Sequence, residues 1–221
     1  NEAAILFTVN WAIAMVEQTR RKVILVDMSA RSGDMARALG LHPPLSMDAM
    51  LKENDFMDMG ALRSLITVHP SGLEILSLHP KLVKDHLLGV VPSLLGLLKD
   101  HYDYSLLVDP IEDEDLTTIF FRECDRAMSI VWDQAIELAD EVLPRLRLMS
   151  DHETMPFMTV FLHHPDSHHA FKANYRVPWS ESFHQPFRAT GNPYLTSDQA
   201  VRATEALERV ARGLRVGAVP A

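Results

Sequence analysis

Two short apolar runs, each closed by an aspartate, constrain the fold more than any other feature of the sequence. Residues 23–27 read VILVD, and residues 104–109 read YSLLVD. Runs that are apolar at consecutive positions are typical of strands buried on both faces of a parallel sheet. Parallel strands need crossover connections, which are usually helices. The two runs therefore predict an α/β fold with a mainly parallel sheet and helices on both faces.

The rest of the chain alternates between helix and strand as this fold requires. Apolar residues recur at helical spacing from Ile5 to about residues 18–21. Further helices are expected over 35–39, 47–51, 82–98 with a break at Pro92, 116–124, 135–149 with Pro144 inside or splitting it, and 197–214. Further strands are expected over 73–78, 126–132, 157–162 and 177–179, and residues 62–68 form a short helix or an extended piece. No repeat or linker divides the 221 residues, so 1–221 is expected to be a single domain.

Composition excludes several classes of function. The formal net charge of −9 argues against binding along a nucleic-acid backbone. No apolar run approaches the ~20 residues of a membrane span, and no signal peptide is visible. The single cysteine, Cys124, rules out an internal disulfide and suits a reducing compartment. We therefore expect a cytoplasmic protein.

Asp27 and Asp109 close the two apolar runs, and both are expected at the carboxyl edge of the sheet, where α/β proteins bind ligands. Aspartates at that edge often hold Mg²⁺ or its waters against a bound phosphate. An aspartate can equally end a strand and cap the next turn. The two residues by themselves leave both interpretations open.

Several segments, taken in order, resemble motifs of the MinD/ParA ATPases, which belong to the P-loop class. They are VILVDMSARSGD at 23–34, HPSGLEIL at 69–76, YDYSLLVDP at 102–110, LADEV at 138–142 and GNPY at 191–194. The resemblance covers nearly the whole chain. It is greatest to the CpaE/TadZ branch, whose members help to localise and assemble type IV (Flp/Tad) pili and include proteins with degraded ATP sites.

The resemblance also shows where this chain departs from the family's P-loop. Aligned on VNWA at residues 9–12, the loop falls on residues 1–6. Ala3 then stands in place of a glycine, Ala4 in place of the phosphate-binding lysine, and Ile5 in place of the hydroxyl that ligates Mg²⁺. The loop needs glycine so that backbone N–H groups can wrap the phosphates, and it needs the lysine to neutralise their charge.

Other family positions have changed as well. Ser29 replaces the second acid of an Asp-x-Asp pair, His163 replaces an asparagine, and Ser180 replaces an aspartate. Four acids crowd residues 112–115. The resemblance thus implies a degenerate nucleotide site at Ala3, Ala4, Ile5, Asp27 and Asp109. We expect it to hold no catalytic residue, metal or cofactor.

Three functions are compatible with these departures. The first is a non-enzymatic homodimer that positions pilus or envelope assembly proteins at the inner membrane or the cell pole. The second is a working ParA/MinD ATPase, using ATP and Mg²⁺, with its P-loop upstream of residue 1. Because the chain begins with Asn1, we expect a preceding strand, and the sequence leaves open whether a receiver-like domain, such as CpaE/TadZ proteins often carry, precedes it. The third is an α/β domain whose site has been repurposed for another small molecule.

A histidine-rich segment and the last predicted helix each allow two interpretations. His163, His164, His168 and His169 lie near Asp166 and would suit Zn²⁺, but no cysteine joins them, and a solvated loop is favoured. Arginines line the last helix opposite an apolar stripe, at Arg202, Arg209, Arg212 and Arg215. This helix either contacts an anionic membrane or packs on the sheet, and two glutamates on it favour packing. The aromatic stretch from Trp179 to Tyr194 is either core or a partner surface.

Overall fold

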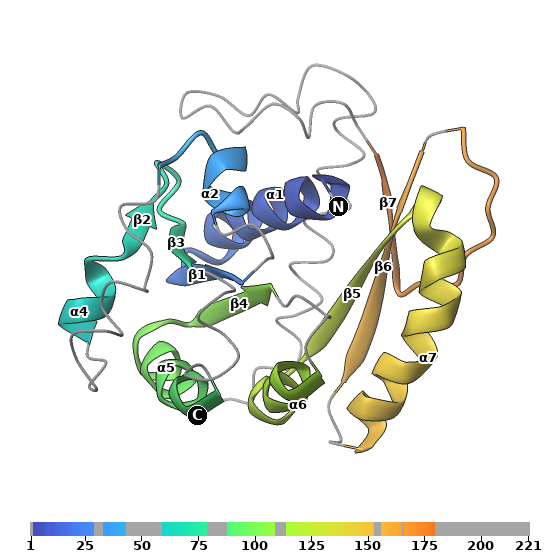
Figure 1. The fold of residues 1–221 in the computed structure, drawn as a ribbon. Coiled ribbons are helices and arrows are strands. Elements are labelled where there is room, and N and C mark those ends of the chain that lie inside the picture. Colours follow the sequence, from blue (N-terminus) through green and yellow to red (C-terminus); the bar gives the residue numbers. More distant parts are fainter. Residues whose placement is uncertain are drawn as a thin grey trace. The chain divides into compact units, whose positions relative to one another are not determined.

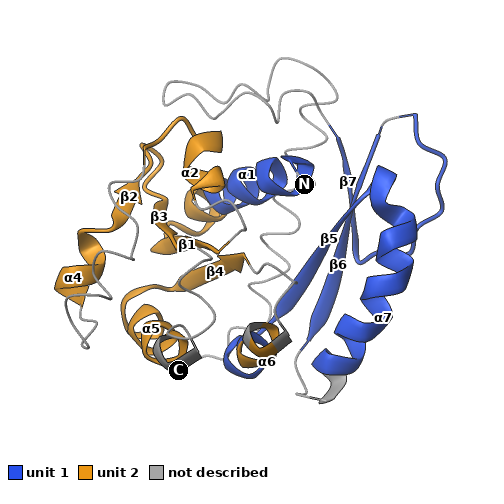
Figure 2. Cartoon of the chain, in the orientation of Figure 1, with its two compact units in different colours: residues 1–14, 120–221 blue, residues 15–119 orange. Residues whose placement is uncertain are grey.

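A computed structural model describes most of the chain up to residue 179. The described residues are 2–28, 33–42, 59–78, 88–108, 114–152, 156–164 and 166–179. The predicted helices at 47–51 and 197–214 lie outside them, as do Ser29, Asp109 and Ser180. The chain divides into two compact units, residues 15–119 and residues 1–14 with 120–221 (Figure 2).

The unit of residues 15–119 is built on a four-stranded sheet. Its strands are β1 (Val23–Asp27), β2 (Ile66–Val68), β3 (Glu74–Ser77) and β4 (Tyr104–Val108), in the order β2-β3-β1-β4. β1 runs parallel to both β3 and β4, whereas β2 is antiparallel to β3. All five residues of β1 are buried, as an apolar run between two parallel neighbours requires.

Three helices belong to the same unit. They are α2 (Asp34–Ala38), α4 (Met59–Arg63) and α5 (Leu88–His101). α2 and α5 lie on opposite sides of the sheet (Figure 1). Residues 62–68, for which the sequence allows either a short helix or an extended piece, contain both. The helix α4 ends at Arg63, and the strand β2 begins at Ile66.

The other unit contains a fully parallel sheet. Strands β5 (Ala127–Trp132), β6 (Phe157–His163) and β7 (Tyr175–Pro178) lie in that order, and β5 leads through the 3-10 turn η3 (Asp133–Ala135) into α7 (Ile136–His152). α7 packs on this sheet through a buried cluster of Val131, Ala139, Leu143 and Phe161. The right-hand part of Figure 1 shows α7 along one face of the three strands.

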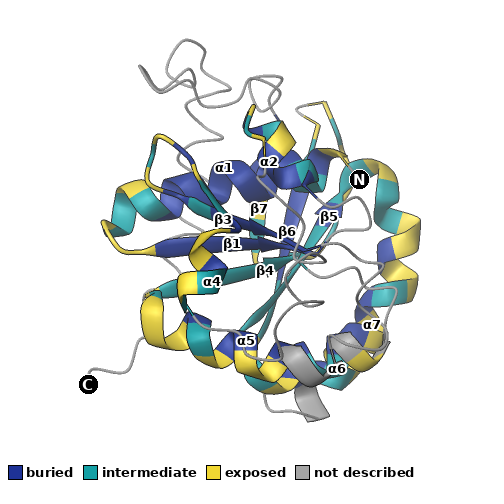
Figure 3. Cartoon of the chain, turned by 60° about the vertical axis from the view of Figure 1, so that its left-hand side comes forward, coloured by how far each residue is buried: buried dark blue, intermediate teal, exposed yellow. Residues whose placement is uncertain are grey.

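Two helices cross the division between the units along the chain. α1 (Glu2–Thr19) has residues 2–14 in one unit and 15–19 in the other, and α6 (Glu114–Glu123) divides between residues 119 and 120. α1 is apolar around nearly its whole circumference, and it is buried along most of its length (Figure 3). Its buried polar side chains Thr8 and Asn10 donate hydrogen bonds to the carbonyl oxygens of Ala4 and Leu6.

The fold class predicted from the sequence is confirmed, and one local prediction is wrong. The expected break at Pro92 does not occur, because α5 continues through this residue to His101. Pro92 lacks a backbone N–H and removes one intrahelical hydrogen bond, but the helix is held by the burial of its neighbours Val91, Leu94 and Leu95. Pro144 lies inside α7 and does not split it.

Candidate functional site

Asp27 lies at the carboxyl end of β1, as predicted, and its side chain is engaged within the protein. The residue is fully buried, and its Oδ2 accepts a hydrogen bond from the backbone N–H of Met35 over 3.1 Å. Met35 is in the first turn of α2, where N–H groups lack intrahelical partners and the helix dipole favours negative charge. Of the two interpretations of Asp27, the structure therefore contains the capping contact, in which the carboxylate accepts a hydrogen bond from the start of α2.

A left-handed glycine positions α2 to receive this carboxylate. Gly33, directly before the helix, has φ +83°, a conformation that side-chain-bearing residues rarely adopt. At the other end, Gly40 has φ +68°, and the N–H of Leu41 bonds back to the carbonyl oxygen of Ala36 over 2.9 Å. Gly40 thus ends the helix as the sequence predicts.

Ser77 stands beside Asp27 on the neighbouring strand and was missed by the sequence analysis. The two residues are register partners of the parallel strands β1 and β3, so their side chains leave the same face of the sheet. The Ser77 hydroxyl is buried and has no hydrogen-bond partner among the described residues. The alternating pattern of residues 73–78 indicated the strand, but nothing in the sequence indicated which residue would face Asp27.

Ala3, Ala4 and Ile5 lie in the first turn and a half of α1. The sequence alignment placed a loop over residues 1–6, whereas the structure is helical from Glu2 onward. The physical reason is that two alanines provide strong helix propensity where a P-loop has glycine to break it. Ala3 is buried and Glu2 is exposed.

The predicted site residues are thus distributed over both units. Ala3, Ala4 and Ile5 belong to the unit that contains residues 1–14, and Asp27 belongs to the other. Asp109 directly follows β4 but lies outside the described residues. Next to it, the carbonyl oxygen of Val108 accepts the N–H of Met28 over 3.2 Å, which holds the ends of β4 and β1 together.

Three solved structures show which known fold this arrangement belongs to. A chain of the MinC:MinD cell division protein complex of Aquifex aeolicus matches with a TM-score of 0.70 and 17% identity, over 100% of this chain and 93% of that one. A ParA family ATPase from Chlorobium tepidum TLS matches with a TM-score of 0.67 and 14% identity, over 96% and 94%. The septum site-determining protein MinD of Pyrococcus horikoshii OT3, complexed with Mg-ADP, matches with a TM-score of 0.65 and 16% identity, over 100% and 95%.

The chain has the fold of the MinD and ParA ATPases. No family model and no curated protein sequence matches it. The resemblance read from the sequence motifs is therefore supported at the level of the MinD/ParA fold. The narrower likeness to the CpaE/TadZ branch remains a prediction.

At the carboxyl edge of the three-stranded sheet, this MinD/ParA fold carries a pair of tryptophans. Trp132 ends β5 and Trp179 follows β7, and their rings meet edge to face with centroids 4.7 Å apart. The N–H of Trp179 donates to the carbonyl oxygen of His163 over 2.7 Å. Trp179 is buried, which favours the core interpretation for this residue of the aromatic stretch. In the sequence, only their positions at the ends of the predicted strands 126–132 and 177–179 could have marked the two tryptophans.

The histidines of residues 163–169 lie on the surface. His164, His168 and His169 are exposed, and His164 Nδ1 lies 3.6 Å from Asp166 Oδ2. Within the described part of the chain, no group of three or more histidine, cysteine or acidic side chains could hold a metal ion. Among the helices that the structure describes, none is long and apolar enough to cross a membrane.

Proposed function

We propose that this chain is a MinD/ParA-fold protein that does not hydrolyse ATP and serves as a localisation or assembly factor. By the resemblance of this chain to the CpaE/TadZ branch, the machinery that it would localise or help to assemble is a type IV Flp/Tad pilus or a related envelope assembly. The observation that carries the proposal is the sequence of the first turn of α1, which contains Glu2, Ala3, Ala4 and Ile5. A P-loop ATPase needs glycine, lysine and a hydroxyl at this position.

The chemistry of this helix start disfavours a polyanion. No cationic side chain lies among residues 2–5, and the one charged group there is the Glu2 carboxylate. A carboxylate in the first turn is favourable for the helix dipole but repels phosphate oxygens. In an active site Asp27 would bind Mg²⁺ or its waters, but here one of its carboxylate oxygens accepts a hydrogen bond from the N–H of Met35. The expectation of no catalytic residue, metal or cofactor follows from these substitutions.

An interaction role suits what remains of the scaffold. The similar MinD of Aquifex aeolicus occurs in a complex with MinC, so this fold does present surfaces to partner proteins. We propose that this chain forms a homodimer without nucleotide and contacts pilus or envelope proteins from the cytoplasm. Peripheral contact of residues 197–214 with the inner membrane is the alternative to packing of this segment on the sheet, and cosedimentation with anionic and neutral vesicles distinguishes the two.

Calorimetric titration of ATP–Mg²⁺ into the purified chain tests the main proposal. We expect no binding tighter than about 100 μM, which corresponds to about −5.5 kcal/mol. Light scattering in the same buffers is expected to give one mass with and without ATP. The matched control is a titration of Mg²⁺ alone. Tight ATP binding, or a dimer that forms only with ATP, would contradict the proposal.

The alternative is an active ATPase whose P-loop precedes residue 1. It is favoured by the MinD of Pyrococcus horikoshii, which has the same fold and holds Mg-ADP. Hydrolysis measured on the complete gene product separates the two functions. An upstream Gly-Lys-Thr or Gly-Lys-Ser segment with ATP turnover, abolished by changing its lysine to alanine, would establish the alternative.

A further inference from the structure

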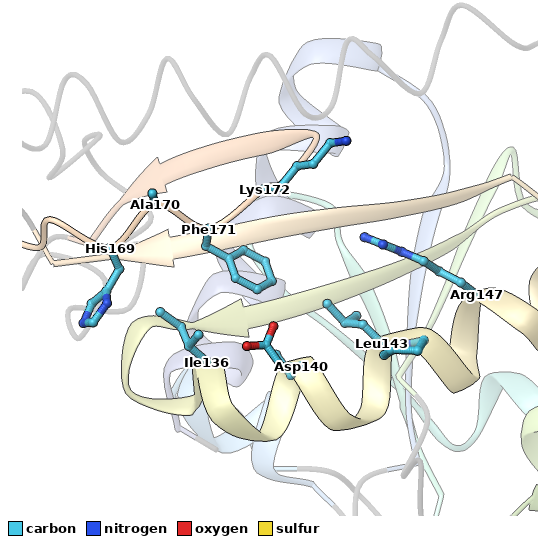
Figure 4. A pocket seen from close by; sticks show the side chains of 10 residues that line it. Ile136, Asp140, Leu143, Arg147, His169, Ala170, Phe171 and Lys172 are labelled. Atoms are coloured by element: carbon cyan, nitrogen blue, oxygen red, sulfur yellow. The ribbon is translucent and has the colours of Figure 1, made fainter.

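A surface cavity lies between α7 and the loop that joins β6 to β7, within one unit, and Phe171 of this loop packs against the buried cluster that includes Leu143. Its volume is about 310 Å³, and its lining comes from residues 136–147 of α7 and residues 169–172 of the loop. The apolar residues Ile136, Leu143 and Phe171 line it together with charged residues of α7 and of the loop. Figure 4 shows the Phe171 ring directed from the loop toward the helix. A volume of this size is at the lower end of the range for small-molecule sites.

The loop that forms the outer wall of the cavity is held by hydrogen bonds of Arg176, Ser167 and Asn174. The guanidinium of Arg176 lies 4.9 Å from the centroid of the Phe161 ring and donates hydrogen bonds to the carbonyl oxygens of Phe171 and His169, over 3.0 and 3.2 Å. The hydroxyl of Ser167 donates to Asp133 over 2.9 Å.

Asn174 fixes the far end of the loop. Its N–H donates to the carbonyl oxygen of Thr159 over 2.9 Å, and its Oδ1 accepts the N–H of Thr159 over 2.8 Å. The wall is therefore pre-organised by contacts to β6, β7 and η3. The binding of a ligand in the cavity would therefore not be opposed by the conformational entropy of ordering this loop.

The charges at the cavity are unusual for this protein. The chain carries a net charge of −9, yet two cations, Arg147 and Lys172, line the cavity against one carboxylate, Asp140. None of the three forms an ion pair or hydrogen bond that the structure records among its described residues. In Figure 4 the Arg147 guanidinium leans back along α7 toward Leu143, whereas the Lys172 ammonium points away from the helix. This backward lean is the usual direction of long side chains on a helix.

We propose that this cavity binds a small molecule with an aromatic or alkyl body and a single anionic group. The apolar body would lie against Phe171 and Leu143, and the anionic group would meet the Arg147 guanidinium, with Lys172 adding long-range attraction. Asp140 faces Phe171 across the cavity and opposes a second negative charge, so it selects against dianions. The inference does not depend on the proposed function, because no residue of the nucleotide-type site lines the cavity.

Fluorescence titration with anilinonaphthalene sulfonate, an aromatic monoanion, tests the site, and phenylnaphthylamine serves as its uncharged counterpart. We expect the anion to bind the native chain more tightly than the neutral probe. Arg147→Gln should weaken the binding of the anion roughly tenfold, as the loss of one charge-assisted hydrogen bond would. Lys172→Gln should weaken it less, and Asp140→Asn should strengthen it.

Arg145→Gln is the matched control, because Arg145 lies on α7 and is exposed but does not line the cavity. It should leave the affinity unchanged. Far-UV circular dichroism and a melting curve for each variant show that it is folded. Absence of anion binding, or equal affinities across all four variants, would overturn the proposal.

Discussion

Asp27 is a buried carboxylate whose structural partner is the start of a helix. Its neighbours in the sheet are Ser77 on β3 and Val108 on β4, and its hydrogen-bond donor is the N–H of Met35. A buried acceptor that satisfies a helix N–H stabilises the fold whether or not a ligand binds. The role of this residue can therefore be measured on the protein alone.

Replacing Asp27 by leucine should lower the free energy of unfolding by about 1 to 3 kcal/mol, because the buried N–H of Met35 then lacks an acceptor. Urea denaturation measures this loss. Asp27→Asn is the control, since its side-chain oxygen still accepts the bond, and it should retain most of the stability. If the two variants lose the same amount, the charge of Asp27 matters rather than the hydrogen bond.

Tyr102 is the second residue whose environment has a measurable consequence. Its hydroxyl donates to Glu74 Oε2 over 2.5 Å. Burial raises the pKa of the Tyr102 phenol well above its ordinary value, and the hydrogen bond and the negative charge of Glu74 raise this pKa further. The nearby Arg63 charge acts weakly in the opposite direction.

Because the pKa of Tyr102 is higher in the folded than in the unfolded chain, this group contributes stability that is fully present below pH ~10. The contribution is lost as the pH rises above that value, since the unfolded chain releases the proton first. Tyr102→Phe should cost about 1 kcal/mol at pH 7 through the lost hydrogen bond and should reduce the alkaline loss of stability. Urea denaturation at pH 7 and at about pH 11 checks both parts. An unchanged alkaline slope would show that another group is responsible.

At the scale of elements, glycines act differently according to the backbone conformation that they adopt. Gly40 ends α2 with φ +68°, and Gly96 lies inside α5. A Cβ placed on either residue would meet no atom within 4 Å, so packing does not distinguish them. The effect of adding a side chain at the two positions therefore differs only through the backbone conformation, which is left-handed at Gly40 and helical at Gly96.

Gly40→Ala should therefore destabilise the protein by about 1 kcal/mol, because alanine is strained in the left-handed region. Gly96→Ala should stabilise it by about 0.5 to 1 kcal/mol, because alanine is the better helix former. Thermal melts of the two variants form a matched pair of the same chemical change. The same sign for both would contradict the assigned backbone conformations.

At the scale of the whole molecule, the two compact units share helices along the chain. α1 contributes residues to both units, and α6 does the same. All three tryptophans, Trp11, Trp132 and Trp179, belong to the unit that contains residues 1–14 and 120–221. Tryptophan fluorescence therefore reports on this unit, whereas circular dichroism reports on both.

If residues 1–221 form one cooperative domain, as we propose, thermal unfolding followed by the two signals should coincide. Leu25→Ala, a core change in the unit of residues 15–119, should lower the melting temperature of the tryptophan signal as much as that of the circular dichroism signal. The exposed Leu148→Ala is the control and should shift neither. Separate transitions would show two independently stable units.

The fold class and most of the helices and strands follow from patterns of adjacent residues in the sequence. The consecutive apolar residues of Val23–Asp27 predict a central strand, and the helical spacing of apolar residues from Ile5 onward predicts the helix α1. The position of Asp27 at a strand end was also readable, since it depends only on where the run stops. Such features are local, and the residues that cause them are adjacent in the chain.

Which side chains meet depends on how the fold brings distant segments together. Asp27 faces Ser77, Tyr102 reaches Glu74 across 28 positions, and Ser167 reaches Asp133 across 34. Strand order and crossover geometry set these partners, and no local pattern encodes them. The cavity beside α7 has the same origin, because its wall is a loop held in place by residues of other strands. The physical reason is that burial and hydrogen bonding act between groups brought together by the fold, whereas helix and strand preferences act along the chain.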